Sequence, residues 1–294
     1  MSKTKVYLDR CVLAKMQKDF SLLEKMKKIA KDNRFHYVIS AIHLEEAASV
    51  FTRSFKLYNK NQNDKNCISE NYLDYIKNDL AFYEDLSGGK ILKPLSYNKE
   101  FKELELSLDN YLEMIKAKIN ETDAAIDNDE SKKDIFNANS ENSAFDEITK
   151  HYDMPKIYQK IKELDPKSFF EDETVSNIWQ IFFKEYQKKY LSKEGKFFSF
   201  NSFVFFTQVE IVSDFLQFIK YYKDKIPSDE KSCKRHNNIR SRMYDTGHVI
   251  YSSYCDYFVS DDIKLVKRAK VIFQKIGGKT PSVIELESFI NRYE

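Results

Sequence analysis

Acidic side chains follow three short apolar runs near the two ends of the chain. The runs and their polar successors are Val6-Tyr7-Leu8 with Asp9, Tyr37-Val38-Ile39 with Ser40 and then Glu45-Glu46, and Tyr257-Phe258-Val259 with Ser260-Asp261-Asp262. Such runs of β-branched and aromatic residues indicate buried strands. In open α/β sheets, reactive groups collect outside the carboxyl ends of the strands. We therefore expect these acids to meet at one edge of a sheet.

A fourth acid, Asp245, precedes the last of these strands. Asp245, His248 and Ser252 are spaced i, i+3 and i+7, which places them on one stripe of a helix. A helix histidine is more often packed or hydrogen-bonded than bound to a metal. His248 is therefore expected beside the ligands, as are Glu45 and Asp261.

Four carboxylates in one pocket repel each other and cannot all stay ionised without a cation. Hard oxygen ligands select Mg²⁺ or Mn²⁺ rather than Zn²⁺. Such ions suit in-line attack of water on a phosphodiester, with no nucleophilic side chain. The predicted ligands are Asp9, Glu46, Asp245 and Asp262, with Glu45 and Asp261 as the alternatives within their pairs.

These residues also carry a resemblance to a known family. DxxVL from Asp9, ISxxxLEE from Ile39, DxxH from Asp245 and FVSDDxxLxxRA from Phe258 together resemble the PIN-domain family of metal-dependent ribonucleases. The resemblance implies a three-layer α/β/α fold with a parallel central sheet and the same four acids at its carboxyl edge. It also implies that Ser260 helps to hold a water or the phosphate. Arg10 departs from the family pattern, which usually has a small hydroxyl residue or Asn there.

The resemblance covers only the two ends of the 294-residue chain, about half of it. Scarce glycine and proline, 6 and 5 residues, favour long helices in the middle. We expect a split PIN-like domain over residues 1–58 and 200–294, with a mostly helical insertion over 59–199. Within the insertion, apolar spacing predicts a helix over Phe101–Ile119, and the acid-rich segment Glu121–Glu147 is predicted to be a surface loop.

The charge balance excludes a polybasic coat but permits a local basic rim. Lys plus Arg number 48 against 46 Asp plus Glu. The residues predicted to contact a nucleic-acid backbone are Arg240, Arg242, Lys264 and Arg268. No apolar leader or membrane span is visible, and the four cysteines lack metal-ligand spacing, so a cytoplasmic protein is expected.

The sequence therefore predicts a PIN-like endoribonuclease that depends on Mg²⁺ or Mn²⁺. One alternative is a non-catalytic module that binds RNA or a protein chain. Another is the same fold acting on single-stranded or flapped DNA, because the contacts that read a 2′-hydroxyl cannot be placed. The resemblance implies roles as a toxin, in phage defence or in RNA maturation, with an antitoxin or a second copy of the chain as candidate partners.

Overall fold

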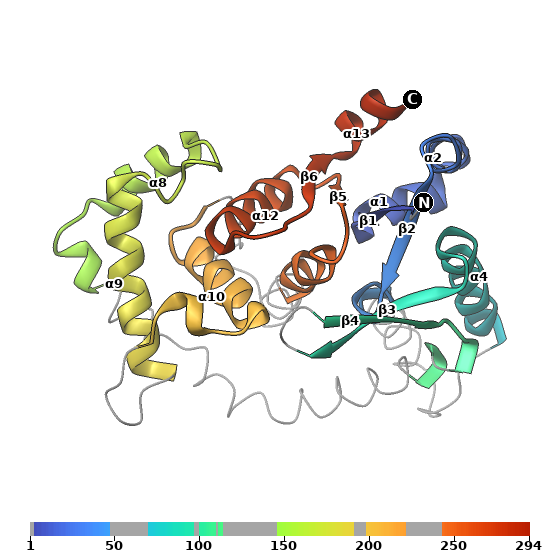
Figure 1. Cartoon of the computed structure of the whole chain (residues 1–294), viewed down its shortest axis with the longest axis horizontal. Helices are drawn as coiled ribbons and strands as arrows, with labels where there is room; N and C mark the ends of the chain where they lie inside the picture. The colour runs from blue at the N-terminus through green and yellow to red at the C-terminus, as the bar shows by residue number, and fades with distance from the viewer. Residues whose placement is uncertain are drawn as a thin grey trace.

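A six-stranded sheet forms the centre of the molecule, in the order β4-β3-β2-β1-β5-β6 (Figure 1). The computed structural model describes residues 3–47, 70–96, 100–109, 111–113, 146–190, 198–221 and 243–294. The strands are β1 Thr4–Leu8, β2 Phe35–Ser40, β3 Lys90–Ser96, β4 Glu100–Glu105, β5 Tyr257–Ser260 and β6 Ser282–Glu285. Neighbouring strands pair in parallel except β3 and β4, which are antiparallel. The predicted α/β class is confirmed, and the sheet is compatible with a three-layer arrangement.

The strand order reverses beside β1. From β1 the chain adds β2 and then β3 on one side, and β5 and β6 follow on the other side. In open α/β sheets, such a reversal leaves a crevice outside the carboxyl ends of the two strands that flank it. The ends of β1 and β5 are therefore the place at which a site is expected, independently of any resemblance.

Helices connect the parallel strands, as parallel pairing requires. They are α1 Arg10–Lys18 and α2 Phe20–Asp32 between β1 and β2, α4 Glu70–Ser87 before β3, α12 Ile263–Ile276 between β5 and β6, and α13 Leu286–Tyr293 after β6. Residues 41–47 and 243–252 are also helical. Asp19 separates α1 from α2, because its side chain accepts a hydrogen bond from Leu22 N (3.1 Å) and caps the start of α2.

The middle of the chain is not only helical. β3 and β4 lie within residues 59–199 and extend the central sheet, so the sheet is not built from the two chain ends alone. The predicted helix from Phe101 is wrong over its first part, where β4 pairs with β3. Phe101 packs its ring against those of Tyr251 and Tyr254 (centroids 5.7 and 5.6 Å), so tertiary contacts override the helical spacing. Residues 114–119 of that helix, and nearly all of the predicted acidic loop, lie outside the described residues.

An aromatic cluster joins α9, η1 and α10 among the remaining helices. These are α8 Met154–Glu163, α9 Glu173–Tyr190, the short 3-10 helix η1 Phe200–Ser202 and α10 Phe205–Phe218. Trp179 of α9 stacks on Phe183 (5.4 Å) and meets Phe215 of α10 edge-on (5.0 Å). Figure 1 shows α10 between α9 and α12. The buried face of α10 is formed by Val209, Ile211, Val212, Phe215 and Leu216, so this helix belongs to the core. Among the described helices, none is long and apolar enough to cross a membrane.

Candidate active site at the carboxyl ends of β1 and β5

Asp9 is a buried carboxylate directly after β1, with 5% of its surface exposed. Its backbone N–H donates to Val259 O (2.8 Å), which ties the end of β1 to β5. Oδ1 accepts from Arg10 N (2.7 Å), and Oδ2 accepts from Ser260 Oγ and from Cys11 Sγ, both at 2.8 Å. Burial and the charge of Asp9 raise the pKa of the Cys11 thiol, which keeps that thiol a protonated donor.

Ser260 is fully buried and connects the two strand ends. Its hydroxyl donates to Asp9 Oδ2 and accepts from Asp262 N (3.0 Å). The family resemblance implied that this hydroxyl holds a water or a phosphate. In the structure its proton is donated to Asp9, and the role toward a water or a phosphate stays a prediction.

His248 lies beside the predicted ligands and contacts two of them directly. Nε2 of this 1%-exposed imidazole is 3.0 Å from Glu46 Oε2 and 3.6 Å from Asp9 Oδ1. Burial lowers the pKa of His248, but the hydrogen bond to Glu46 and the charges of Asp9, Glu46 and Asp245 raise it more, so the net shift is upward. Three carboxylates therefore act on one imidazole.

A buried hydrogen-bond chain leads from His248 into the sheet. Its Nδ1 is 2.9 Å from Tyr7 Oη, which is 2.7 Å from Ser40 Oγ. Ser40 N donates to His43 Nδ1 (3.0 Å), so the proton of His43 is assigned to Nε2, which donates to Leu8 O (2.7 Å). Burial, followed by the nearby His248, lowers the pKa of His43. Sequence reasoning missed Tyr7 and His43, although His43 stands three residues after Ser40, which ends a predicted strand.

Asp245 pairs with a buried arginine. Its Oδ2 accepts from Arg268 Nη2 at 2.6 Å. Burial raises the pKa of Asp245 to about 6. The charge of Arg268 lowers this pKa, and repulsion from Asp9 adds to the rise. Arg268 was expected to contact a nucleic-acid backbone, but only 5% of it is exposed, because it lies on the face of α12 that packs inward with Leu265 and Ala269.

The two acids after β5 have different partners. Asp262 begins α12, and its Oδ1 accepts from the backbone N–H groups of Lys264 (2.8 Å) and Leu265 (3.2 Å). Asp261 forms an ion pair with Lys15 on α1. Asp262 is thus held at the same sheet edge as Asp9, joined to it through Ser260.

The other predicted residues divide between the site and its surroundings. Glu46, 29% exposed, contacts His248. Burial, and after it the charge of Glu45, raises the pKa of Tyr251, so Glu45 lies toward that ring. Glu46 is therefore the member of the pair that faces the site. Lys264 is exposed at the start of α12, while residues 240 and 242, the sites of the two predicted basic contacts, lie outside the described residues.

Asp9, Glu46 and Asp245 all offer carboxylate oxygens, which are the ligands that a hard divalent cation prefers. The charges of all three also act on the imidazole of His248. The described residues do not, however, include three or more acidic, His or Cys side chains already arranged around one metal position. His248 and Arg268 contact the acids instead. Comparisons with protein-family models, curated proteins and solved structures found no match to this chain.

Proposed function

We propose that this chain is a PIN-like nuclease that hydrolyses RNA phosphodiester bonds with Mg²⁺ or Mn²⁺. The observation that carries the proposal is the position of Asp9. This buried carboxylate lies where the strand order reverses, and both it and Glu46 contact the imidazole of His248. A buried carboxylate placed beside other charged groups at a strand reversal is costly for the fold, which makes it a functional candidate.

Each residue has a part in this proposal. Asp9, Glu46 and Asp245 would hold the ion, with Asp262 adding negative charge from the same edge. The bound ion would supply an activated water. Ser260 and Cys11 fix the Asp9 carboxylate through their hydrogen bonds. The exposed Lys264 would contact a phosphate. Cytoplasmic localisation, an antitoxin partner and a homodimer stay predictions.

A second candidate is a module that binds RNA or a protein chain without cleaving. The observation that favours it is that all four acids already have partners within the protein, among them Asp245 on Arg268 and Asp262 on the amides of α12. Single-stranded or flapped DNA is the alternative substrate for the nuclease, because the site is defined by phosphate chemistry.

The test is cleavage of labelled single-stranded RNA, single-stranded DNA and flapped DNA in Mn²⁺, Mg²⁺ or EDTA. We expect metal-dependent RNA cleavage that falls at least about 100-fold in Asp9→Asn and Glu46→Gln, on the scale seen when a strongly stabilising catalytic contact is removed. Asp85→Asn, which removes an exposed acid paired with Lys27 (2.7 Å), serves as the matched control and should retain activity. Unchanged cleavage by Asp9→Asn would refute the site, and metal-independent RNA binding without cleavage would establish the binding module.

A further inference from the structure

His248 brings a nitrogen donor to the two acids that carry the proposed site. Its Nε2 lies 3.0 Å from Glu46 Oε2 and 3.6 Å from Asp9 Oδ1. Two donor atoms held about 2.1 Å from one ion, at angles of about 90–120°, are about 3.0–3.6 Å apart. The distance from the imidazole to each carboxylate is therefore one that neighbouring ligands of a single cation have. A hydrogen bond from Nε2 has a similar length, so the other nitrogen of the ring must also be considered.

The Nδ1 atom of His248 faces a chain of groups that can accept its proton. Nδ1 is 2.9 Å from Tyr7 Oη, which is 2.7 Å from Ser40 Oγ. Ser40 Oγ is in turn 3.0 Å from His43 Nδ1, which is an acceptor because His43 Nε2 donates to Leu8 O. With a cation at Nε2 in place of a proton, each group can donate to the next, from His248 Nδ1–H as far as His43. A metal-bound histidine has this arrangement, in which its second nitrogen donates a hydrogen bond into the protein.

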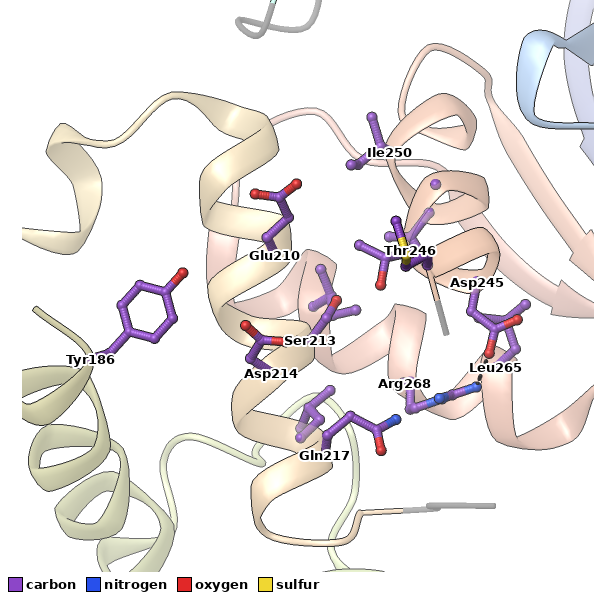
Figure 2. Close-up of a pocket in the computed structure, with 15 residues that line it drawn as sticks. Tyr186, Glu210, Ser213, Asp214, Gln217, Asp245, Thr246, Ile250, Leu265 and Arg268 are labelled. Carbon is purple, nitrogen blue, oxygen red and sulfur yellow. Dashed lines mark hydrogen bonds and ion pairs between the residues drawn. The ribbon is translucent and has the colours of Figure 1, made fainter. Parts of the chain in front are cut away.

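Asp245 is less available to an ion than His248 is. It stands three residues before His248 on the helix of residues 243–252. Figure 2 shows its carboxylate turned toward Arg268, whose Nη2 donates to Oδ2 at 2.6 Å. Asp9 and Glu46, in contrast, contact the imidazole itself. The donors that meet at this point are thus two carboxylates and one imidazole.

We propose that His248 is a direct ligand of the metal ion, together with Asp9 and Glu46, and that the site therefore selects Mn²⁺ over Mg²⁺. The proposal rests on the proposed nuclease function and names its metal. Mg²⁺ is a hard cation that takes oxygen ligands, whereas imidazole nitrogen favours first-row transition metals. Among the described residues, no three such side chains already surround one metal position, so the contact between Glu46 and the imidazole must open. Glu46 has room to turn, because its side chain is 29% exposed.

The test follows Mn²⁺ on the full chain by electron spin echo envelope modulation, which detects a nitrogen nucleus bonded to the ion. We expect the signal of one bound imidazole in the wild-type protein and its loss in His248→Gln. Titration calorimetry should show that wild type binds Mn²⁺ more tightly than Mg²⁺. In His248→Gln the affinity for Mn²⁺ should fall at least about tenfold, the lower end of the range seen when even a supporting partner of a ligand is removed. The affinity for Mg²⁺ should change little.

Tyr7→Phe tests the hydrogen bonds behind the ring. It removes only the hydroxyl that faces Nδ1, so the affinity for Mn²⁺ should fall about 10–100-fold while the nitrogen signal remains. His151→Gln removes an exposed histidine at the end of a helical turn outside the site and serves as the matched control. It should keep both the affinity and the signal.

Mn²⁺ bound to wild type without a nitrogen signal would overturn the assignment and leave His248 as an ion-pair partner of the two acids. Equal affinities for Mn²⁺ and Mg²⁺, or no binding of Mn²⁺, would also overturn it. The proposed function can fail independently. A nitrogen signal that His248→Gln removes, in a protein that cleaves no RNA or DNA, keeps the ligand and loses the nuclease. RNA cleavage with Mn²⁺ bound through oxygen alone keeps the nuclease and loses the ligand.

Discussion

His248 is the residue on which the charges of the site converge. Its Nε2 faces Glu46 and Asp9, while its Nδ1 faces the hydroxyl of Tyr7. Because a hydroxyl can donate or accept, Tyr7 can accept from the charged imidazole and donate to the neutral one. When the imidazole is charged, the Tyr7 hydroxyl donates its hydrogen bond to Ser40. When the imidazole is neutral, Ser40 can donate to Tyr7. The buried chain therefore tolerates both charge states of His248.

This arrangement predicts how stability depends on pH. The pKa of His248 is raised in the folded protein. The stability that it contributes is therefore fully present below its unfolded pKa, about 6.5, and is lost as pH rises through the folded pKa. We expect His248→Gln to lower the free energy of unfolding more at pH 5.5 than at pH 8.5, as measured by urea denaturation.

Glu46→Gln provides the control for this prediction. A double-mutant cycle with His248→Gln should show a coupling energy of about 0.5–3 kcal/mol at pH 5.5, the range for side chains in contact, and less at pH 8.5. A destabilisation by His248→Gln that is the same at both pH values would show that the imidazole acts only by packing.

At the scale of the helix, α12 begins on a residue that was predicted as a ligand. Asn and Asp cap helices equally well, whereas replacing either by Ala costs about 1 kcal/mol. We therefore expect Asp262→Ala to lower the free energy of unfolding by about 1 kcal/mol and Asp262→Asn to leave it almost unchanged. Thermal unfolding measures both effects on stability. RNA cleavage by the same two variants then tests whether the charge of Asp262 has a role in catalysis. Cleavage that falls in both variants assigns a role to the charge, whereas wild-type cleavage in Asp262→Asn leaves only the cap.

Two helices that carry site residues are in close contact at a glycine. A Cβ at Gly247 would lie 2.9 Å from Cγ1 and Cδ1 of Ile42, and the two helices carry His248 and Glu46 respectively. Overpacking of this kind costs about 1–3 kcal/mol, and we expect Gly247→Ala to separate the imidazole from Glu46. The expected result is a lower free energy of unfolding and reduced RNA cleavage.

The second substitution in that test is Ile42→Ala, which removes both atoms that would collide. Combined with Gly247→Ala it should recover part of the lost cleavage, although Ile42→Ala alone leaves a cavity. No recovery in the double variant, with Gly247→Ala as stable as wild type, would mean that the contact does not hold the two helices at their spacing.

Strands that are apolar runs in the sequence could be predicted. Strands that form only because they pair with a neighbouring strand could not. β1, β2 and β5 are apolar runs that are buried in the sheet. β3 carries Pro94, and β4 is EFKELE, whose spacing also fits a helix. Their pairing with each other is a tertiary property, which cannot be read from the spacing of apolar residues along the sequence.

The site divides in the same way. Asp9 and Ser260 could be placed together because the ends of neighbouring parallel strands must meet. The contacts of His248 with two of the acids depend on how one helix lies over the sheet, and the burial of Arg268 depends on which face of α12 packs inward. Neither follows from spacing alone, so Arg268 resembled a surface cation.

For the whole molecule, Asp245 opposes folding in the neutral range. The pKa of Asp245 is raised to about 6, so its contribution lowers stability as pH rises from its unfolded pKa, about 3.9, through 6. His248 loses its stabilising charge as pH rises further. Both groups therefore make the folded protein less stable at pH 8 than at pH 5, in contrast to carboxylates whose pKa is lowered by folding.

A divalent cation bound at these acids should reverse that loss. Ligands that bind only the folded state stabilise it, by about 2.7 kcal/mol at 100 times Kd, which for a domain of this size corresponds to a rise in Tm of about 5–10 °C. We expect Mn²⁺ to raise the Tm of wild type at pH 8, and EDTA to remove the rise. The rise should be much smaller at pH 5, where Asp245 is protonated and His248 is charged, and absent in Asp9→Asn. A rise of equal size at both pH values, or one that persists in Asp9→Asn, would place the ion elsewhere in the protein.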